Sequence, residues 1–139
     1  MKAARTIEVV AALIRDEDGR VLVVRKRGTT TFMQPGGKRD AGEDDIAALS
    51  RELSEELGCD LVPASVRPLG AFDAVAANEP GFRVLANVYG VEVTGDIAPR
   101  QEIDEAMWID PAVPPDILLA PLTRDHVLPL AVAGRAGHA

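Results

Sequence analysis

Three glutamates near the middle of the chain have the spacing of neighbours on one side of a helix. Glu52, Glu55 and Glu56 occupy positions i, i+3 and i+4, and side chains with this spacing lie next to one another on a helix surface. At about 100° per residue, the three carboxylates fall within roughly one third of the circumference. Like charges at i, i+4 weaken a helix by about 0.2–0.5 kcal/mol per pair. A bound cation would remove that cost.

Binding of a hard divalent cation is the chemistry that suits such a cluster. Carboxylate oxygens select Mg²⁺, Mn²⁺ or Ca²⁺, and magnesium completes its coordination shell with water and substrate phosphates. A metal ion held in this way can bridge a diphosphate, offset its charge and activate water. The alternative is an acidic, solvated helix face without a ligand, and the three glutamates alone do not decide between the two.

A helix over Asp44–Leu57 would carry these carboxylates. Asp44 and Asp45 place negative charge in the first turn, which suits the helix dipole. Gly58 occupies the position of a C-terminal cap. The apolar residues of the segment share one stripe at helical spacing, namely Ile46, Leu49, Leu53 and Leu57. The helix can therefore pack its leucines on a sheet and still present the three carboxylates at another face.

Strands are predicted on both sides of this helix. In chain order they are Val9–Ile14, Val21–Val24, Val66–Ala74, Phe82–Val93 and Ala106–Ile109. The turn sequence Asp16–Gly19 predicts that the first two form a hairpin, and Asn78–Gly81 is a turn between two longer strands. A second, proline-disturbed helix is expected at about residues 116–132, followed by a loose tail at 134–139. Together these elements indicate a layered α/β domain with a mixed sheet.

Composition limits the class of protein. The 139 residues fit a single domain over 1–139, and the 47% apolar content is sufficient for one core. No run of 18 apolar residues suggests a membrane span, and Glu8 interrupts the short apolar start too early for a signal peptide. Cys59 is the only cysteine, so a reducing, cytoplasmic location is expected. The net charge of −7 argues against polymeric nucleic acid as a partner.

Residues 37–59 resemble the Nudix box, G-x5-E-x7-R-E-U-x-E-E-x-G-U, where U is a bulky aliphatic residue. The matching positions are Gly37, Glu43, Arg51, Glu52, Leu53, Glu55, Glu56 and Gly58. Cys59 departs from the last position, but cysteine packs as a small hydrophobe. The resemblance implies a Nudix-type α/β/α sandwich with a central mixed β-sheet, and a MutT-like hydrolase that cuts a diphosphate linkage.

The resemblance also implies roles by position. Glu52, Glu55 and Glu56 match the family's metal-binding glutamates, one of which can also act as the base for the attacking water. The carbonyl of Gly36 matches a further metal contact. The implied cofactor is Mg²⁺, with Mn²⁺ equally suited to oxygen ligands.

The other box residues are implied to have structural roles. Glu43 and Arg51 match a buried pair that holds the loop against the helix, with an ordinary surface pair as the alternative. Gly37 fits the tight loop and Gly58 fits the helix end.

One acidic residue outside the box is expected to serve as an extra ligand or base. Glu102 lies six residues before Trp108, a spacing similar to that of MutT-like relatives. Glu105 is the competing choice. A solvated loop charge is the alternative interpretation for both.

Basic residues near the box are candidates for binding substrate phosphates. Arg25 and Lys38 are the first candidates, and Lys26 is the next. Lys38 directly follows the double glycine, so it is attached close to the predicted metal loop. For Arg25 and Lys26 the alternative is charge at a strand edge, which discourages aggregation.

The aromatic residues and histidines add few candidates. Phe32, Phe72 and Phe82 could stack on a base, although core packing is the commoner role. His126 and His138 have no partner pattern, and neither is predicted to be a ligand.

The chain resembles a small MutT-like domain without the additional motifs of other subfamilies. This resemblance favours a nucleoside triphosphate as substrate, which would be cleaved to the monophosphate and pyrophosphate. ADP-ribose or a nucleotide sugar is the alternative, although the proline that ADP-ribose hydrolases share is absent. A non-catalytic, nucleotide-sensing module is the alternative of another class, but such modules usually lose box glutamates that this chain keeps. The partner is expected to be a small-molecule nucleotide, and the chain a monomer or homodimer.

Overall fold

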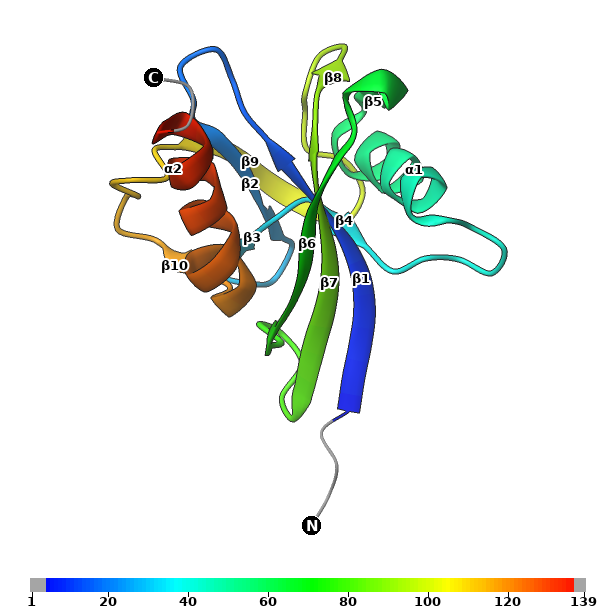
Figure 1. The fold of residues 1–139 in the computed structure, drawn as a ribbon. Helices are drawn as coiled ribbons and strands as arrows, with labels where there is room; N and C mark the ends of the chain where they lie inside the picture. Colours follow the sequence, from blue (N-terminus) through cyan, green and yellow to red (C-terminus); the bar gives the residue numbers. More distant parts are fainter. Residues whose placement is uncertain (1–4, 137–139) are drawn as a thin grey trace.

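The strands lie between two helices that cover opposite sides (Figure 1). The computed structural model describes residues 5–136. Its strands are β1 (Arg5–Ile14), β2 (Val21–Lys26), β3 (Thr31–Met33), β4 (Gly36–Gly37), β5 (Asp60–Leu61), β6 (Arg67–Val75), β7 (Phe82–Val91), β8 (Val93–Thr94), β9 (Ile103–Ile109) and β10 (Leu118–Leu119). Its helical segments are α1 (Asp45–Leu57), η1 (Pro63–Ser65), η2 (Thr123–Val127) and α2 (Leu128–Ala136). Among these residues, no helix has the length and apolar character needed to cross a membrane.

The strands form two four-stranded sheets of mixed direction. One has the order β4-β1-β7-β6 and the other β10-β3-β2-β9, while β5 and β8 form a separate pair. Each large sheet contains one parallel pairing, β1 with β7 and β10 with β3. The predicted α/β class with a mixed sheet is confirmed, with the strands divided between two sheets.

The predicted hairpin at the start of the chain is only partly correct. The turn at Asp16–Gly19 forms, with Gly19 in the left-handed region and its N–H donating to the Asp16 carbonyl at 3.1 Å. Within the described residues, however, only an isolated bridge between Arg15 and Val21 joins the two strands. β1 instead takes β7 along its whole length and β4 on its other edge. Because both edges of β1 are occupied, β2 pairs with β3 and β9 in the other sheet.

Successive residues of β1 face two different cores. Val10, Ala12 and Ile14 pack in the core that contains α1, whereas Ala11 and Leu13 pack in the core that contains α2. Adjacent side chains of a strand point to opposite faces of the sheet. A strand that is covered on both faces is therefore apolar throughout, as this one is.

The helix α1 ends where the sequence predicts and begins one residue later, at Asp45. Asp44 is the N-cap, and its carboxylate accepts a hydrogen bond from the Ala47 N–H at 2.8 Å. Gly58 closes the other end in the left-handed conformation, with its N–H donating to the Ser54 carbonyl at 3.0 Å. Both caps satisfy backbone groups that a helix end leaves unpaired.

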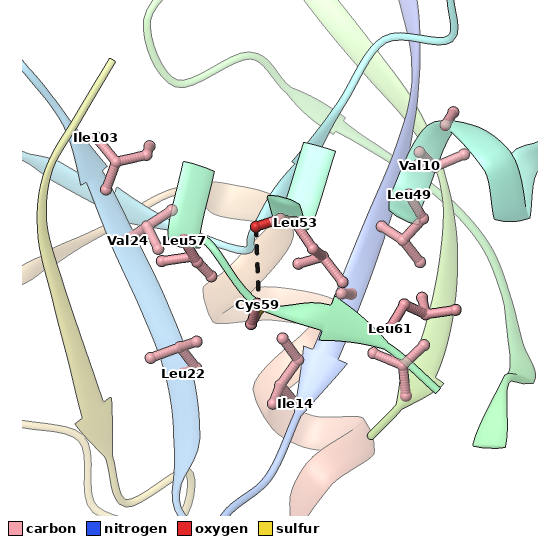
Figure 2. Close-up of a cluster of buried hydrophobic side chains, with 13 residues drawn as sticks. Val10, Ile14, Leu22, Val24, Leu49, Leu53, Leu57, Cys59, Leu61 and Ile103 are labelled. Carbon is pink, nitrogen blue, oxygen red and sulfur yellow. Dashed lines mark hydrogen bonds between the residues drawn. The ribbon is translucent and has the colours of Figure 1, made fainter. Parts of the chain in front are cut away.

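The leucines of α1 form the centre of the first core (Figure 2). Leu49, Leu53 and Leu57 have no exposed surface. Cys59 is equally buried, with its Sγ 3.9 Å from the Leu53 carbonyl oxygen, so it packs at the box position where an aliphatic residue is usual. Ile46 is 42% exposed, which corrects its predicted place in the buried stripe. Its neighbour Asp45 is hydrogen-bonded to Asn87 and Tyr89 of β7.

The end of the chain is more regular than the sequence suggests. The short strand β10 precedes the π-helical segment η2, which continues directly into α2. Because α2 extends to Ala136, residues 134–136 are helical rather than part of a loose tail. Residues 137–139, including His138, lie outside the described part of the chain.

Truncating the central leucine of α1 should destabilise the domain strongly. We expect Leu53→Ala to lower the free energy of unfolding by about 2–5 kcal/mol, since it leaves a cavity in a fully packed core. The control Ile46→Ala changes an exposed residue of the same helix and should cost less than about 1 kcal/mol. Urea unfolding of both variants checks this. Equal losses would show that the burial of α1 has been assigned to the wrong face.

Candidate functional site

A cavity of about 390 Å³ lies beside the carboxylates of α1. Its charged and polar lining includes Glu52 and Glu56 of α1, together with Lys26, Gln34, Lys38, Asn78, Glu79, Glu102 and Thr123. Apolar side chains of β1, β6, β7 and the segment before η2 form much of the remaining wall, including Ile7, Val9, Val75, Val84 and Leu122. The cavity therefore joins an ionic region to an apolar region, a combination typical of sites for small amphipathic ligands.

Glu56 is a buried carboxylate in the wall of this cavity. Its side chain is only 8% exposed, and its Oε1 accepts a hydrogen bond from the Gly36 N–H at 3.2 Å. Burial raises the pKa of Glu56 to about 8, and the neighbouring carboxylate of Glu52 adds to the increase. Without a counter-cation, Glu56 would keep its proton near neutral pH.

Arg51 binds the carboxylates around it. Its guanidinium donates two hydrogen bonds to Glu43, at 2.8 and 2.9 Å, and a third to the carbonyl of Lys38 at 3.0 Å. Another nitrogen reaches Glu52 at 2.8 Å and Glu55 at 3.2 Å. The hydrogen bonds from Arg51 hold the pKa of Glu43 at about 2. This half-buried network attaches the loop before α1 to the helix itself.

Two glycines let the loop approach its neighbours closely. At Gly36, with φ near 140°, a Cβ atom would lie 2.1 Å from the carbonyl oxygen of Val10. At Gly37, a Cβ atom would lie 2.7 Å from a carboxylate oxygen of Glu52. A side chain at either position would push β4 away from β1 or displace Glu52 from the cavity.

The start of α1 is attached to the sheet by Asp45. This carboxylate accepts hydrogen bonds from the Tyr89 hydroxyl at 2.5 Å and the Asn87 amide at 2.9 Å, and it also pairs with Arg39. The hydrogen bond from Tyr89 is the largest cause of a lowered pKa at Asp45, and the same bond raises the pKa of Tyr89 to about 12. The orientation of the helix relative to β7 therefore depends on a polar contact as well as on the leucines.

The three box glutamates are not equivalent in position. Glu52 and Glu56 line the cavity, whereas the side chain of Glu55 is 43% exposed, contacts Arg51 and does not line it. Within residues 5–136, no group of three His, Cys, Asp or Glu side chains has the arrangement needed to hold a metal ion. Arg51 draws Glu52 and Glu55 toward itself, which accounts for this arrangement.

The structure separates the two acidic candidates outside the box. Glu102 lines the cavity. Glu105 does not, and one of its carboxylate oxygens lies 3.3 Å from Arg25.

The basic candidates also separate. Lys26 and Lys38 line the cavity, but Arg25 is bound by Asp104 at 2.8 Å and by the carbonyl of Thr29 at 2.8 Å. Arg25 and Lys26 are adjacent in β2, so their side chains point to opposite faces. Strand alternation places Lys26, the lower-ranked candidate, at the cavity instead of Arg25.

The aromatic candidates lie away from the cavity lining. Phe32 is buried in the second core, which is the one that contains α2. Phe72 stacks on His126 with ring centroids 5.0 Å apart. The ring of Phe82 lies 5.7 Å from the guanidinium of Arg5. These contacts agree with the packing interpretation of the aromatic residues.

The sequence did not predict four polar residues that line the cavity, namely Gln34, Asn78, Glu79 and Thr123. Gln34 directly precedes the Pro35-Gly36-Gly37 loop, and this adjacency is the one signal that could have identified it. Thr123 lies 86 residues beyond Gly37 in a segment without a motif, so only folding brings it to the site.

Comparisons with known proteins agree on one family. The sequence profile of the NUDIX domain matches residues 5–130. An 8-oxo-dGTP diphosphatase of Haemophilus influenzae is 32% identical to this chain over 110 residues, which cover 76% of this chain and 77% of that protein. A putative 8-oxo-dGTP diphosphatase 2 of Mycobacterium tuberculosis is 37% identical over 98 residues, or 70% of this chain and 66% of that protein.

Solved structures show the same fold. The solution structure of the E. coli ORF135 protein matches with a TM-score of 0.69 and 26% identity, over 97% of this chain and 92% of that one. A MutT NUDIX hydrolase from Burkholderia pseudomallei matches with a TM-score of 0.71 and 24% identity, over 93% of this chain and 97% of that one. The second likeness is a likeness of fold alone.

The raised pKa of Glu56 predicts a pH dependence of stability in the presence of EDTA. From about pH 4.5 to about pH 8 the unfolded chain loses the proton of Glu56 while the folded protein keeps it. Folding stability should therefore fall as pH rises through this window and level off above it. We expect a decrease in Tm of roughly 5 °C or more for the wild type, and a flatter profile for Glu56→Gln. An identical slope in the variant would assign the effect to another group.

The ion pair of Glu43 with Arg51 predicts the opposite sign at acid pH. The pKa of Glu43 is lowered to about 2, so its contribution to stability is present above about pH 4.5 and disappears as pH falls toward 2. Glu43→Gln should lower Tm at neutral pH and make Tm less dependent on pH at acid pH. Arg51→Ala should do the same, and the double variant should lose less than the sum of the two. Additive losses, measured against the exposed control Glu17→Gln, would contradict a direct pairing.

Proposed function

The chain belongs to the Nudix hydrolase family, whose members act on diphosphate linkages, and on this premise we propose that it hydrolyses a nucleoside or deoxynucleoside triphosphate to the monophosphate and pyrophosphate. The observation that carries the proposal is the lining of the cavity. Two carboxylates of the box, two lysines and an apolar wall meet in one cavity of about 390 Å³. A nucleotide offers matching parts, with charged phosphates at one end and a largely apolar base at the other.

We assign Glu52, Glu55 and Glu56, with the carbonyl of Gly36, as the residues that would hold the divalent cation. Their chemistry fits a hard ion, because all the donors are oxygens and most are carboxylates. Glu55 would have to turn away from Arg51 to join Glu52 and Glu56 at the ion. The buried carboxylate of Glu56 supports the assignment, since burial and the nearby Glu52 raise its pKa and a positive charge beside it would stabilise its ionised form. A bound Mg²⁺ or Mn²⁺ would offset phosphate charge and lower the pKa of a coordinated water.

The remaining residues act on the substrate and on the attacking water. Lys26 and Lys38 lie in the cavity wall, where their ammonium groups would pair with phosphate oxygens. Glu102 would accept the proton of the attacking water as a general base. Arg51 positions the box by holding Glu43 and Glu52. Water attack at phosphorus breaks one P–O–P linkage, and the freed pyrophosphate leaves with its electron pair.

The relatives favour a triphosphate over the other substrates. The names of the Haemophilus influenzae and Mycobacterium tuberculosis relatives specify a deoxynucleoside triphosphate as their substrate. The oxidised form 8-oxo-dGTP is therefore a substrate to test first here, beside the ordinary nucleotides. A small-molecule substrate of this kind also suits the overall net charge of −7, which disfavours polymeric nucleic acid.

A substrate panel tests the proposal directly. We expect Mg²⁺-dependent release of pyrophosphate from at least one triphosphate among dGTP, dATP, dCTP, dTTP, their ribonucleotides and 8-oxo-dGTP, with no release in EDTA. ADP-ribose and UDP-glucose belong in the same panel. Turnover of one of these two instead would replace the triphosphate with a nucleoside diphosphate conjugate. Folded protein that binds Mg²⁺ but cleaves nothing in the panel would contradict the proposal.

Charge-neutral variants test the assigned residues. Glu56→Gln and Glu55→Gln should each lower kcat at least about 100-fold while the protein remains folded, because a transition-state interaction is lost. The added Mg²⁺ should raise the Tm of the wild type and not that of Glu56→Gln. Glu17→Gln, in an exposed turn, is the control and should retain full turnover. Near-normal kcat for Glu55→Gln alone would remove Glu55 from the metal site and leave the other ligands in place.

A further inference from the structure

One residue beside the cavity has a strained backbone. Gln101 has a φ of 50°, and it is the only non-glycine residue with a positive φ within residues 5–136. A residue other than glycine is uncommon in this region, because its Cβ crowds the neighbouring backbone. Such strain persists only where the surrounding structure holds it, and it is found mainly at functional sites. Gln101 directly precedes Glu102, which lines the cavity, so the strain lies next to the proposed chemistry.

Gln101 and Glu102 are the two central residues of a tight turn. The N–H of Ile103 donates to the carbonyl of Arg100 at 2.9 Å, which closes the turn. Where the first central residue of a turn has a positive φ, it is usually glycine, asparagine or aspartate. Ile103 is 1% exposed and packs in the core that contains α1 (Figure 2). The turn is therefore attached on its C-terminal side to the same core as the helix.

The segment before the turn is bound to the end of α1. The N–H of Ala98 donates to the carbonyl of Leu57 at 3.0 Å, and the N–H of Arg100 donates to the carbonyl of Glu56 at 2.8 Å. The last carbonyls of a helix have no partner within the helix, so these two bonds satisfy them. The guanidinium of Arg100 also covers Gly58, where a Cβ atom would lie 2.4 Å from its Cζ. The turn is therefore joined through Arg100 to the residue that carries the buried carboxylate.

Arg27 holds the other side of the turn. Its backbone N–H donates to the carbonyl of Glu102 at 2.8 Å, and its Nε donates to the carbonyl of Gln101, also at 2.8 Å. One residue thus binds the carbonyls of both central residues. Arg27 directly follows Lys26, which lines the cavity and is the register partner of Ile103. The turn is therefore fixed beside a lysine that we assign to the phosphates.

The carboxylate of Glu102 depends on this backbone for its position. Glu52 is held by Arg51, and Glu56 by the N–H of Gly36. Among the residues that the structure describes, no hydrogen bond or ion pair holds the carboxylate of Glu102, and the residue is exposed. A general base has to lie within hydrogen-bond reach of the proton that it accepts. The backbone of the turn is therefore the restraint that places this side chain at the cavity.

We propose that the turn at residues 100–103 positions the general base, with Gln101 and Arg27 as positioning residues. The inference rests on the proposed hydrolysis and adds residues that act on it only through Glu102. The positive φ at Gln101 allows the chain to leave the end of α1, reverse and enter β9 with Glu102 at the cavity wall. A displacement of about 1 Å at a reacting group can lower a rate about 100-fold. Correct placement of the base therefore offsets the strain in the turn.

Two substitutions at Gln101 separate the backbone from the side chain. Gln101→Gly and Gln101→Val both remove an exposed side chain, but glycine accepts a positive φ and a β-branched residue does not. We expect Gln101→Val to lower kcat about 10- to 100-fold, with KM within about twofold of the wild type, because the turn has to open. Gln101→Gly should restore kcat to within about threefold of the wild type. Equal kcat values for the two variants would overturn the proposal.

A double-mutant cycle tests whether the effect passes through Glu102. Glu102→Gln removes the base itself, so the addition of Gln101→Val to it should lower kcat by less than about twofold. A general loss of structure would lower kcat by the same factor with and without Glu102, and this result would contradict a positioning role. The Tm increase caused by Mg²⁺ should be retained in Gln101→Val, because the box carboxylates are unchanged. Loss of that increase would place the damage in the box instead.

Arg27→Met tests the second positioning residue. The variant removes the Nε donor and leaves the backbone N–H, so kcat should fall about fivefold, the effect of one hydrogen bond. Its effect should also disappear when Glu102 is already replaced by glutamine. A higher KM with unchanged kcat would show instead that Arg27 binds the substrate. That outcome would remove Arg27 from the positioning element.

The choice of substrate separates this inference from the proposed function. Every variant is assayed with a compound of the substrate panel that the wild type cleaves. If this compound is ADP-ribose or UDP-glucose, the triphosphate substrate fails, and the same kcat comparisons still decide the positioning element. If a triphosphate is cleaved and Gln101→Val matches the wild type, only the positioning element fails. If the wild type cleaves no compound of the panel, both fail.

Discussion

The hydrogen bonds of one guanidinium hold the site together. Arg51 contacts Glu43, Glu52 and Glu55 and also binds the carbonyl of Lys38. Without this positive charge, carboxylates brought so close would repel one another and separate the loop from the helix. The planar fork of an arginine can bind two of these groups at defined angles, which a lysine cannot do. Arg51 therefore fixes the acidic face of α1 relative to the loop before it and to the cavity wall.

The helix α1 connects the stability of the domain to its chemistry. Leu49, Leu53 and Leu57 bury one side of the helix completely, while Glu52 and Glu56 face the cavity from the adjoining side. A helix that is rotated or shifted would lose core packing and displace the carboxylates at the same time. The pKa of Glu56, raised to about 8 by burial, shows the cost of placing a carboxylate between the core and the cavity. Carboxylates with strongly raised pKa values are found mainly at functional sites.

The separation of β1 from β2 makes the cavity possible. If the two strands had continued as one hairpin, Lys26 and the first strand would have shared one flat sheet. β1 instead pairs with β7, and β2 turns to β3 and β9, so the two sheets diverge. The lining draws on both sheets and on the segment that enters η2.

The sequence by itself determined the features that depend on near neighbours along the chain. The helix with its C-terminal cap at Gly58 and the turn after β1 follow from spacing and local hydrogen bonding, and the structure agrees with them. Family membership also followed from a local motif. Tertiary structure alone decided which side chains reach the cavity. Lys26 reaches it instead of its neighbour because the pairing of β2 sets which face is turned inward. Thr123 reaches it because η2 packs across the second core. These outcomes depend on contacts between residues far apart in the chain, and no local pattern carries that information.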